Sequence, residues 1–149
     1  SRTYQYLVVQ QKDPFSEDTA FYQNRPLDFV LMNQAAAFLP EFEDFKAFSK
    51  SRTDVKTYLC NITHARWQEE GAYWVFTITA DRFLRNMVRA IVGTLLEVGK
   101  GNLSPEDVKT IIKSRDRSRA GASVPAKGLY LTGISYPEHI QLSDGKRKR

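Results

Sequence analysis

Three arginines and an asparagine are the residues of this 149-residue chain whose spacing most clearly suggests a site for an anion. They stand at relative positions i, i+3, i+4 and i+7, so a helix that begins near Phe83 would present them on one face. The first turns of a helix carry partial positive charge, which disfavours cations unless an acidic group offsets them. The spacing therefore predicts an anion-binding face made of Arg82, Arg85, Asn86 and Arg89.

Arg89 and Gly93 are the two residues of this predicted helix that need an explanation. Arg89 lies deepest in the apolar stretch, and a buried guanidinium requires a carboxylate or phosphate partner. Gly93 follows one turn later, although glycine costs about 1 kcal/mol relative to alanine inside a helix. Its missing side chain either opens access to a ligand or permits close packing against the sheet, in which case the arginines are merely solvated. The pattern favours neither explanation.

The other reactive side chains indicate neither a disulfide nor a metal site. The chain has one cysteine, Cys60, and two isolated histidines, His64 and His139, without metal-ligand spacing. Cys60 falls in a predicted strand, so we interpret it as a small core residue rather than a nucleophile. The lone cysteine, and the absence of a signal-peptide pattern and of a run of eighteen apolar residues, lead us to expect a cytoplasmic protein with no membrane span.

Hydrophobic periodicity predicts the elements that position these residues. Alternating patterns predict strands over residues 4–9, 56–67, 72–80 and 128–136, the middle pair joined by a hairpin turn at Gly71, with a short extended stretch around residues 21–22. Apolar residues at helical spacing predict helices over residues 26–39, 83–99 and 105–113.

This order of elements predicts the fold class. A β-α-β-β-α-β order is typical of a ferredoxin-like α+β sandwich, in which helices cover one face of an antiparallel sheet. We expect a single domain over residues 1–137 and a basic C-terminal tail over residues 138–149.

The overall charge suits an acidic partner such as nucleic acid. Lys and Arg outnumber Asp and Glu by 22 to 17, which gives a net charge of +5. Four of these charges lie in the run from Lys146 to Arg149, which is more typical of a solvated terminus. An RNA site would therefore depend on local clustering of charge.

Four segments, spread along the chain from Arg2 to Leu131, resemble the TruA family of tRNA pseudouridine synthases. The stretch from Phe83 to Gly99, FLRNMVRAIVGTLLEVG, resembles the signature helix of the family. Arg2–Tyr6 is similar to its arginine-tyrosine strand, Asp44–Phe48 to its aspartate-phenylalanine turn, and Pro125–Leu131 to its closing strand. The resemblance is to the C-terminal, RNA-binding half of such an enzyme.

The resemblance implies an isomerase that flips a uridine out of a tRNA anticodon arm, at positions 38 to 40, and converts it to pseudouridine without metal or cofactor. In the family an aspartate attacks the nucleoside, the glycosidic bond breaks, and the base turns and rejoins through carbon. Matched by position, Arg89 pairs with the aspartate, Tyr4 packs on the base, and Leu129 lines the pocket. The resemblance also implies a homodimer. Taken alone, Tyr4 and Leu129 are more typical of ordinary core residues of a sheet.

The family's catalytic aspartate lies in an earlier motif, Gly-Arg-Thr-Asp-x-Gly-Val, on the N-terminal half, and this chain does not contain that motif. Asp54 follows a similar Ser-Arg-Thr run but is succeeded by Val55 and Lys56, without the glycine of the catalytic turn. We therefore interpret Asp54 as a decoy and expect the chain alone to bind without catalysing. Its expected partners are tRNA and the missing N-terminal half of the same protein.

Contacts with tRNA phosphates are expected from residues close to the signature helix. The basic loop from Arg115 to Arg119 is equally typical of an RNA contact and of a solvated loop. The predicted RNA-binding residues are Arg82, Arg85, Asn86 and Lys127.

Two other functional classes stay open at this level. A non-catalytic RNA-binding module of the RRM kind would place aromatic residues on the open face of its central strands. The chain lacks the glycine-aromatic run typical of RRM domains, so we rank this class second. A protein-interaction module, with the numerous aromatic residues forming a dimer surface, is the remaining alternative.

Overall fold

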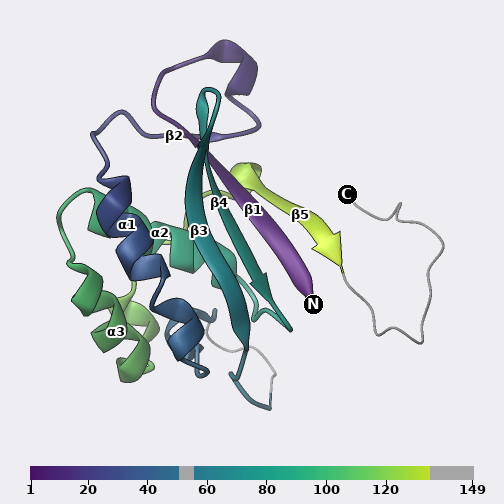
Figure 1. Ribbon diagram of the computed structural model, residues 1–149, viewed down its shortest axis with the longest axis vertical. Coiled ribbons are helices and arrows are strands. Elements are labelled where there is room, and N and C mark those ends of the chain that lie inside the picture. The colour runs from purple at the N-terminus through teal and green to yellow at the C-terminus, as the bar shows by residue number, and fades with distance from the viewer. Residues whose placement is uncertain (51–55, 135–149) are drawn as a thin grey trace.

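The computed structural model describes residues 1–50 and 56–134, and these form one five-stranded sheet with helices on one of its faces (Figure 1). Strand β1 (Arg2–Val9) is central and antiparallel to β4 (Tyr73–Ala80), which pairs in turn with β3 (Ile62–Glu70). The second edge of β1 pairs with β5 (Leu129–Ile134) and, at its C-terminal end, with the short parallel strand β2 (Phe21–Tyr22).

The order β5-β1-β4-β3 is that of the ferredoxin-like plan, in which one helical segment connects β1 to β3 and another connects β4 to β5. The predicted α+β class, with an antiparallel sheet covered on one face, is therefore confirmed, and β2 is a small parallel addition to it. The hairpin between β3 and β4 turns at Gly71, whose φ of 63° lies in the left-handed region that favours glycine.

Helices α1 (Phe29–Ala36), α2 (Met87–Gly99) and α3 (Pro105–Ser114) form the covering layer (Figure 1). Helix α3 begins with a capping box. The Ser104 hydroxyl accepts from the Asp107 amide at 3.1 Å, and the Asp107 carboxylate accepts from the Ser104 amide at 2.8 Å. Such reciprocal capping contributes about 1 kcal/mol to helix stability.

The first helix was predicted to begin at Pro26, but in the structure it begins at Phe29. Asp28 is extended, and its carboxylate accepts a hydrogen bond from the Leu31 amide at 3.1 Å, so Asp28 is the N-cap and Pro26 lies outside the helix. The helix also ends before Pro40, which instead lies in a 3-10 turn over Leu39–Glu41.

Strand β3 begins at Ile62, so the strand predicted from residue 56 was placed too early. The Asn61 amide donates to the Asp81 carboxylate at 2.8 Å, which closes the β3–β4 pair at this end. The preceding residues pair elsewhere, since Leu59 forms a bridge with Asp44 and the Cys60 amide donates to the Glu43 carbonyl. Cys60 is nonetheless a core residue, only 2% exposed, as predicted.

The two faces of the sheet differ in chemistry. Side chains of the helix-covered face, including Tyr6, Trp67, Phe76 and Ile78, are almost completely buried. The centre of the open face is polar, and its side chains bond across the strands: Thr3 with Thr79 at 2.8 Å, and Gln5 with Thr77 at 3.2 Å. An RRM-like module would carry stacking aromatics at the centre of this face, so the structure does not favour that alternative.

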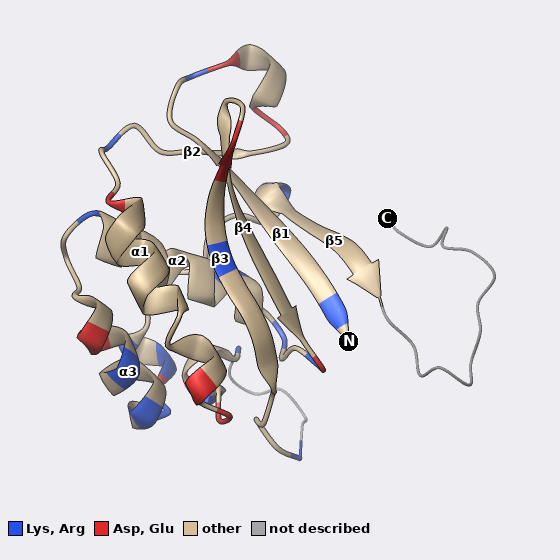
Figure 2. Cartoon of the chain, in the orientation of Figure 1, with Lys and Arg blue, Asp and Glu red and all other residues tan. Residues whose placement is uncertain are grey.

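Charged residues concentrate away from the sheet. Figure 2 shows Lys and Arg gathered around α3 and the segments beside it, whereas the central strands carry few charges. None of the helices in the described residues is both long and apolar enough to cross a membrane. The end of the predicted last strand, Pro137 and the predicted tail over residues 138–149 lie outside the described residues.

Candidate active site

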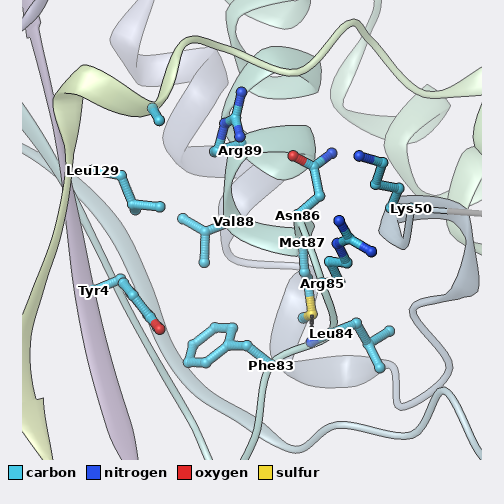
Figure 3. A pocket seen from close by; sticks show the side chains of 11 residues that line it. Tyr4, Lys50, Phe83, Leu84, Arg85, Asn86, Met87, Val88, Arg89 and Leu129 are labelled. Atoms are coloured by element: carbon cyan, nitrogen blue, oxygen red, sulfur yellow. Dashed lines mark hydrogen bonds between the residues drawn. The ribbon is translucent and has the colours of Figure 1, made fainter. Parts of the chain in front are cut away.

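A pocket of about 340 Å³ opens between the sheet and the start of α2. Figure 3 shows Tyr4 and Leu129 on one side of it, Arg89 and Val88 on another, and Phe83 between them at the base of the view. This volume lies at the lower end of the roughly 300–1,000 Å³ typical of small-ligand sites. The fold thus brings together Arg89, Tyr4 and Leu129, which the sequence places far apart.

Arg89 lies in the first turn of α2 and is partly buried. Its Nε donates to the backbone carbonyl of Val124 at 2.8 Å, which fixes the plane of the guanidinium. Among the described residues, no carboxylate lies within ion-pair distance of Arg89 and no side chain accepts a hydrogen bond from it. The two terminal nitrogens are therefore available for a carboxylate, which guanidinium binds bidentately.

Tyr4 projects from β1 on the helix-covered side of the sheet. Its ring meets the edge of Phe83 in a T-shaped contact, with centroids 5.1 Å apart and planes at 89°. Its hydroxyl has no hydrogen-bond partner among the described residues. Leu129, the first residue of β5 and only partly buried, lines the pocket on the same side. An apolar ring and an aliphatic side chain at this spot suit the faces of a planar base.

Tyr6 supports the pocket from beneath. It is fully buried, and its hydroxyl donates to the Pro125 carbonyl at 2.6 Å. Burial raises the pKa of the Tyr6 phenol far above its usual value, and the positive charge of Arg89 opposes this shift. Tyr6 is therefore a neutral hydrogen-bond donor rather than a proton carrier.

The arginines predicted to share a helix face with Arg89 do not lie on the helix. The helix begins only at Met87, because the Arg85 carbonyl accepts from the Lys50 amide at 3.1 Å instead of continuing a helical ladder. Asn86 adopts a left-handed conformation with φ of 68°, which asparagine tolerates better than most residues. The reasoning from helical spacing was therefore wrong for Arg82, Arg85 and Asn86.

These three residues have separate surroundings. The Arg82 guanidinium points to the backbone carbonyls of Thr57, at 3.3 Å, and Leu59, at 2.8 Å. Arg85 is exposed on the rim of the pocket, while the Asn86 amide donates to the Ser123 hydroxyl at 2.6 Å. Their predicted role in RNA binding stays a prediction.

Lys50 is a pocket residue that the sequence did not identify. It is exposed on the rim next to Arg85, to which its backbone is bonded (Figure 3). Within the described part of the chain, the residues lining the pocket include three cations, Lys50, Arg85 and Arg89, and no carboxylate. The pocket therefore has an electrostatic preference for anions.

The segment Gly121–Pro125, which we call the α2 strap, crosses α2 beside Arg89. A Cβ atom on Gly93 would stand only 1.8 Å from the Ala122 carbonyl oxygen, so the strap approaches the helix as closely as a glycine allows. The Gly121 amide donates to the Thr94 hydroxyl at 2.8 Å. Of the two explanations considered for Gly93, close packing is correct, but against the strap rather than the sheet.

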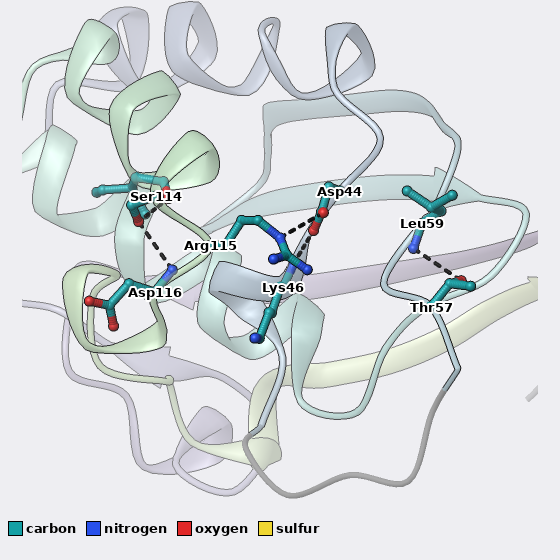
Figure 4. Close-up of polar contacts among 8 residues, drawn as sticks. Asp44, Lys46, Thr57, Leu59, Ser114, Arg115 and Asp116 are labelled. Carbon is teal, nitrogen blue, oxygen red and sulfur yellow. Dashed lines mark hydrogen bonds and ion pairs between the residues drawn. The ribbon is translucent and has the colours of Figure 1, made fainter.

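Lys127 and Asp44 lie away from the pocket. Lys127 donates to the Glu17 carbonyl at 2.7 Å and lines a different cavity near the end of β1. Asp44, in the aspartate-phenylalanine turn, accepts from Arg115 at 2.8 Å and from the Lys46 amide at 3.1 Å (Figure 4). This pair ties the turn to the end of α3. Asp54 lies outside the described residues.

Comparison with known proteins places this geometry in a family. The family model described as tRNA pseudouridine synthase matches residues 42–137, which is more than half of the chain. The chain belongs to this family.

The chain is also similar to curated proteins of the same description. It is 58% identical to the tRNA pseudouridine synthase A of Porphyromonas gingivalis over 144 residues, which cover 95% of this chain and 57% of that protein. It is 53% identical to the tRNA pseudouridine synthase A of Parabacteroides distasonis, covering 94% of this chain and 56% of that protein. The chain thus spans little more than half the length of these relatives.

Proposed function

We propose that the full-length protein converts uridine to pseudouridine in tRNA, and that this chain supplies the base-binding part of its active site. The observation that carries the proposal is the position of Arg89, fixed on the Val124 carbonyl in a pocket with Tyr4 and Leu129, with no carboxylate partner in the described residues. A guanidinium held ready in this way suits an aspartate supplied from the part of the protein that this chain does not cover.

The proposed reaction is an isomerisation that needs no external reactant. The bond between ribose C1′ and uracil N1 breaks with the help of the aspartate, a bond from C1′ to C5 forms, and the C5 proton is lost while N1 gains one. Arg89 pairs with the aspartate and orients it toward C1′. Tyr4, whose hydroxyl is free among the described residues, packs on the base and is placed to relay a proton, and Leu129 closes the pocket on the apolar side.

RNA binding is proposed to depend on cations around the pocket. Exposed Arg85 and Lys50 stand on its rim, where a phosphate of the flipped nucleotide's backbone would pass. Arg82, Asn86 and Lys127 remain proposed secondary contacts. The side chains of all three bind atoms of this chain, so each would have to make an RNA contact alongside its present bond or exchange that bond for it.

The finer assignments rest on the family resemblance. We propose that the modified uridines lie in the anticodon arm, that the enzyme works as a homodimer, and that it acts in the cytoplasm. No metal or cofactor is required by the proposed chemistry, because both bond changes occur within one nucleoside.

The proposal is tested by tritium release from tRNA labelled at uracil C5, using the full-length enzyme. Arg89→Ala should lower kcat by at least about 1,000-fold, because the aspartate loses its charged partner and its orientation. Arg89→Lys should retain more activity than Arg89→Ala, since lysine keeps the positive charge although it lacks the planar guanidinium that binds a carboxylate bidentately. Wild-type kcat in Arg89→Ala, with circular dichroism showing a folded enzyme, would refute the role of Arg89.

A further inference from the structure

The α2 strap is bonded to the rest of the domain at nearly every residue. Its first residue, Gly121, is held by Thr94 on one side and by the Arg117 guanidinium on the other, the latter at 2.9 Å from the Gly121 carbonyl. Its last residue, Pro125, is held by the buried Tyr6 hydroxyl. Irregular segments with this number of side-chain contacts are ordered by the fold around them rather than by their own propensity.

Ser123 is the point where the strap is joined to the start of α2. Its hydroxyl accepts two hydrogen bonds, one from the side-chain amide of Asn86 at 2.6 Å and one from the Arg117 guanidinium at 2.9 Å. Asn86 is the residue that immediately precedes α2 and starts its hydrogen-bond ladder, since its carbonyl accepts from the Ala90 amide. The Ser123 hydroxyl therefore sets the distance between the beginning of the helix and the strap.

Val124, the next residue of the strap, contacts Arg89 twice. Its amide donates to the Arg89 carbonyl at 3.2 Å, and its carbonyl accepts from Arg89 Nε at 2.8 Å. A displacement of Ser123 would thus be passed directly to the atom that fixes the Arg89 side chain. Arg89 acts only when its side chain is correctly oriented. The hydrogen bonds of Ser123 therefore affect the orientation of Arg89 more than the affinity for the substrate.

The composition of this network argues against a purely stabilising role. Arg117 is a partly buried cation, and among the described residues its guanidinium meets a carbonyl and a hydroxyl but no carboxylate. A charge buried in this way is weak evidence for stability, since an apolar residue of similar size often serves better. Asn86 is likewise held in a left-handed conformation that costs backbone energy.

We infer that Asn86, Ser123 and Arg117 form a positioning triad, which holds the strap carbonyl of Val124 where it orients Arg89 for the reaction. This inference rests on the proposed function, and none of the three residues needs to touch the substrate. The triad adds positioning residues to the proposed site. Arg117 and Ser123 lie on a loop that contributes no catalytic side chain of its own.

The test compares Ser123→Ala and Ser123→Thr with the wild type in the full-length enzyme, by tritium release from labelled tRNA. Ser123→Ala should lower kcat about tenfold or more with KM nearly unchanged, because it removes the acceptor that locates Val124. Ser123→Thr keeps the hydroxyl and should restore most of the kcat. Ser118→Ala is the matched control, since Ser118 lies on the same loop but bonds only to exposed Asp116.

A second arm separates positioning from folding. In an Arg89→Lys background the side chain has no Nε to meet the Val124 carbonyl, so adding Ser123→Ala should change kcat less than about twofold. Equal losses in both backgrounds, or a normal kcat in Ser123→Ala, would overturn the triad. If the wild-type enzyme itself releases no tritium, the proposed function fails instead, so the two failures are distinguishable.

Discussion

Replacement of Gly93 by alanine tests whether the contact between α2 and its strap controls the reaction. The new Cβ would lie 1.8 Å from the Ala122 carbonyl oxygen and 2.9 Å from the carbon, and real Cβ atoms do not approach closer than 3.0 Å. The atom that must give way belongs to the backbone, so the strap itself has to move by about 1.2 Å to reach the 3.0 Å limit and by about 1.6 Å to restore an ordinary contact of 3.4 Å.

Such a movement is large on the scale of an active site. A misplacement of about 1 Å typically reduces a rate about 100-fold, and Val124, which holds Arg89, lies only two positions along the strap. The free energy of unfolding should fall by no more than about 2 kcal/mol, because an overpacking cost of about 1–3 kcal/mol is partly offset by the roughly 1 kcal/mol that alanine gains over glycine in a helix. We therefore expect Gly93→Ala to lower kcat about 100-fold in an enzyme that still folds.

The assay is tritium release by the full-length enzyme, run at a temperature where thermal unfolding shows each variant to be fully folded. Gly133→Ala is a suitable control, since a Cβ there would meet Thr3 at an ordinary 3.6 Å. A kcat of Gly93→Ala within about threefold of the wild type would show that the strap can move without disturbing Arg89, and the reasoning about this contact would be refuted.

Three further predictions concern charge, a thiol and a decoy. Replacing Lys50 and Arg85 together by glutamine should raise KM and reduce the slope of log KM against log salt by about 1.5. The control Lys113→Gln, on the exposed side of α3, should leave the slope unchanged. If the double variant has the same slope as the wild type, neither residue contacts RNA. Burial raises the pKa of Cys60 to about 11, so at pH 8 iodoacetamide should modify the native thiol at least about 100-fold more slowly than the thiol in urea. Because the folded pKa is the higher one, the unfolded state ionises first, and stability should fall as pH rises from about 8.5 toward 11; equal alkylation rates in the two states would contradict this. Asp54→Ala should leave the turnover of the full-length enzyme nearly unchanged, and an inactive but folded variant would make Asp54 the nucleophile.

Regular elements and their order could be predicted from the sequence because periodicity alone defines them. The alternation around Tyr4 and Tyr6 indicated the strand β1, and the apolar stripe that follows Phe83 indicated the helix α2, which carries Arg89. The boundaries were less predictable. The start of α2 depends on the bond from Lys50 to the Arg85 carbonyl, a contact between residues far apart in the chain.

The strap could not be predicted, since an irregular segment has no periodicity and its conformation is set by its contacts. Its signal in the sequence was indirect: a glycine inside an apolar helix, where a missing side chain had to be explained. The pairing of Gly93 with Ala122 supplies that explanation. Lys50 was missed for a similar reason, because its neighbours in the sequence carry no pattern that points to a pocket.

We propose that this chain holds Arg89 and the base pocket, while the nucleophile lies in the part of the protein that this chain does not cover. Tritium release from labelled tRNA tests this claim most directly, first with this chain alone, shown by circular dichroism to be folded, and then with the remaining part of the protein added separately. We predict no release by the chain alone, release when the two parts are combined, and loss of that release when the chain carries Arg89→Ala. Release by this chain alone would contradict the account.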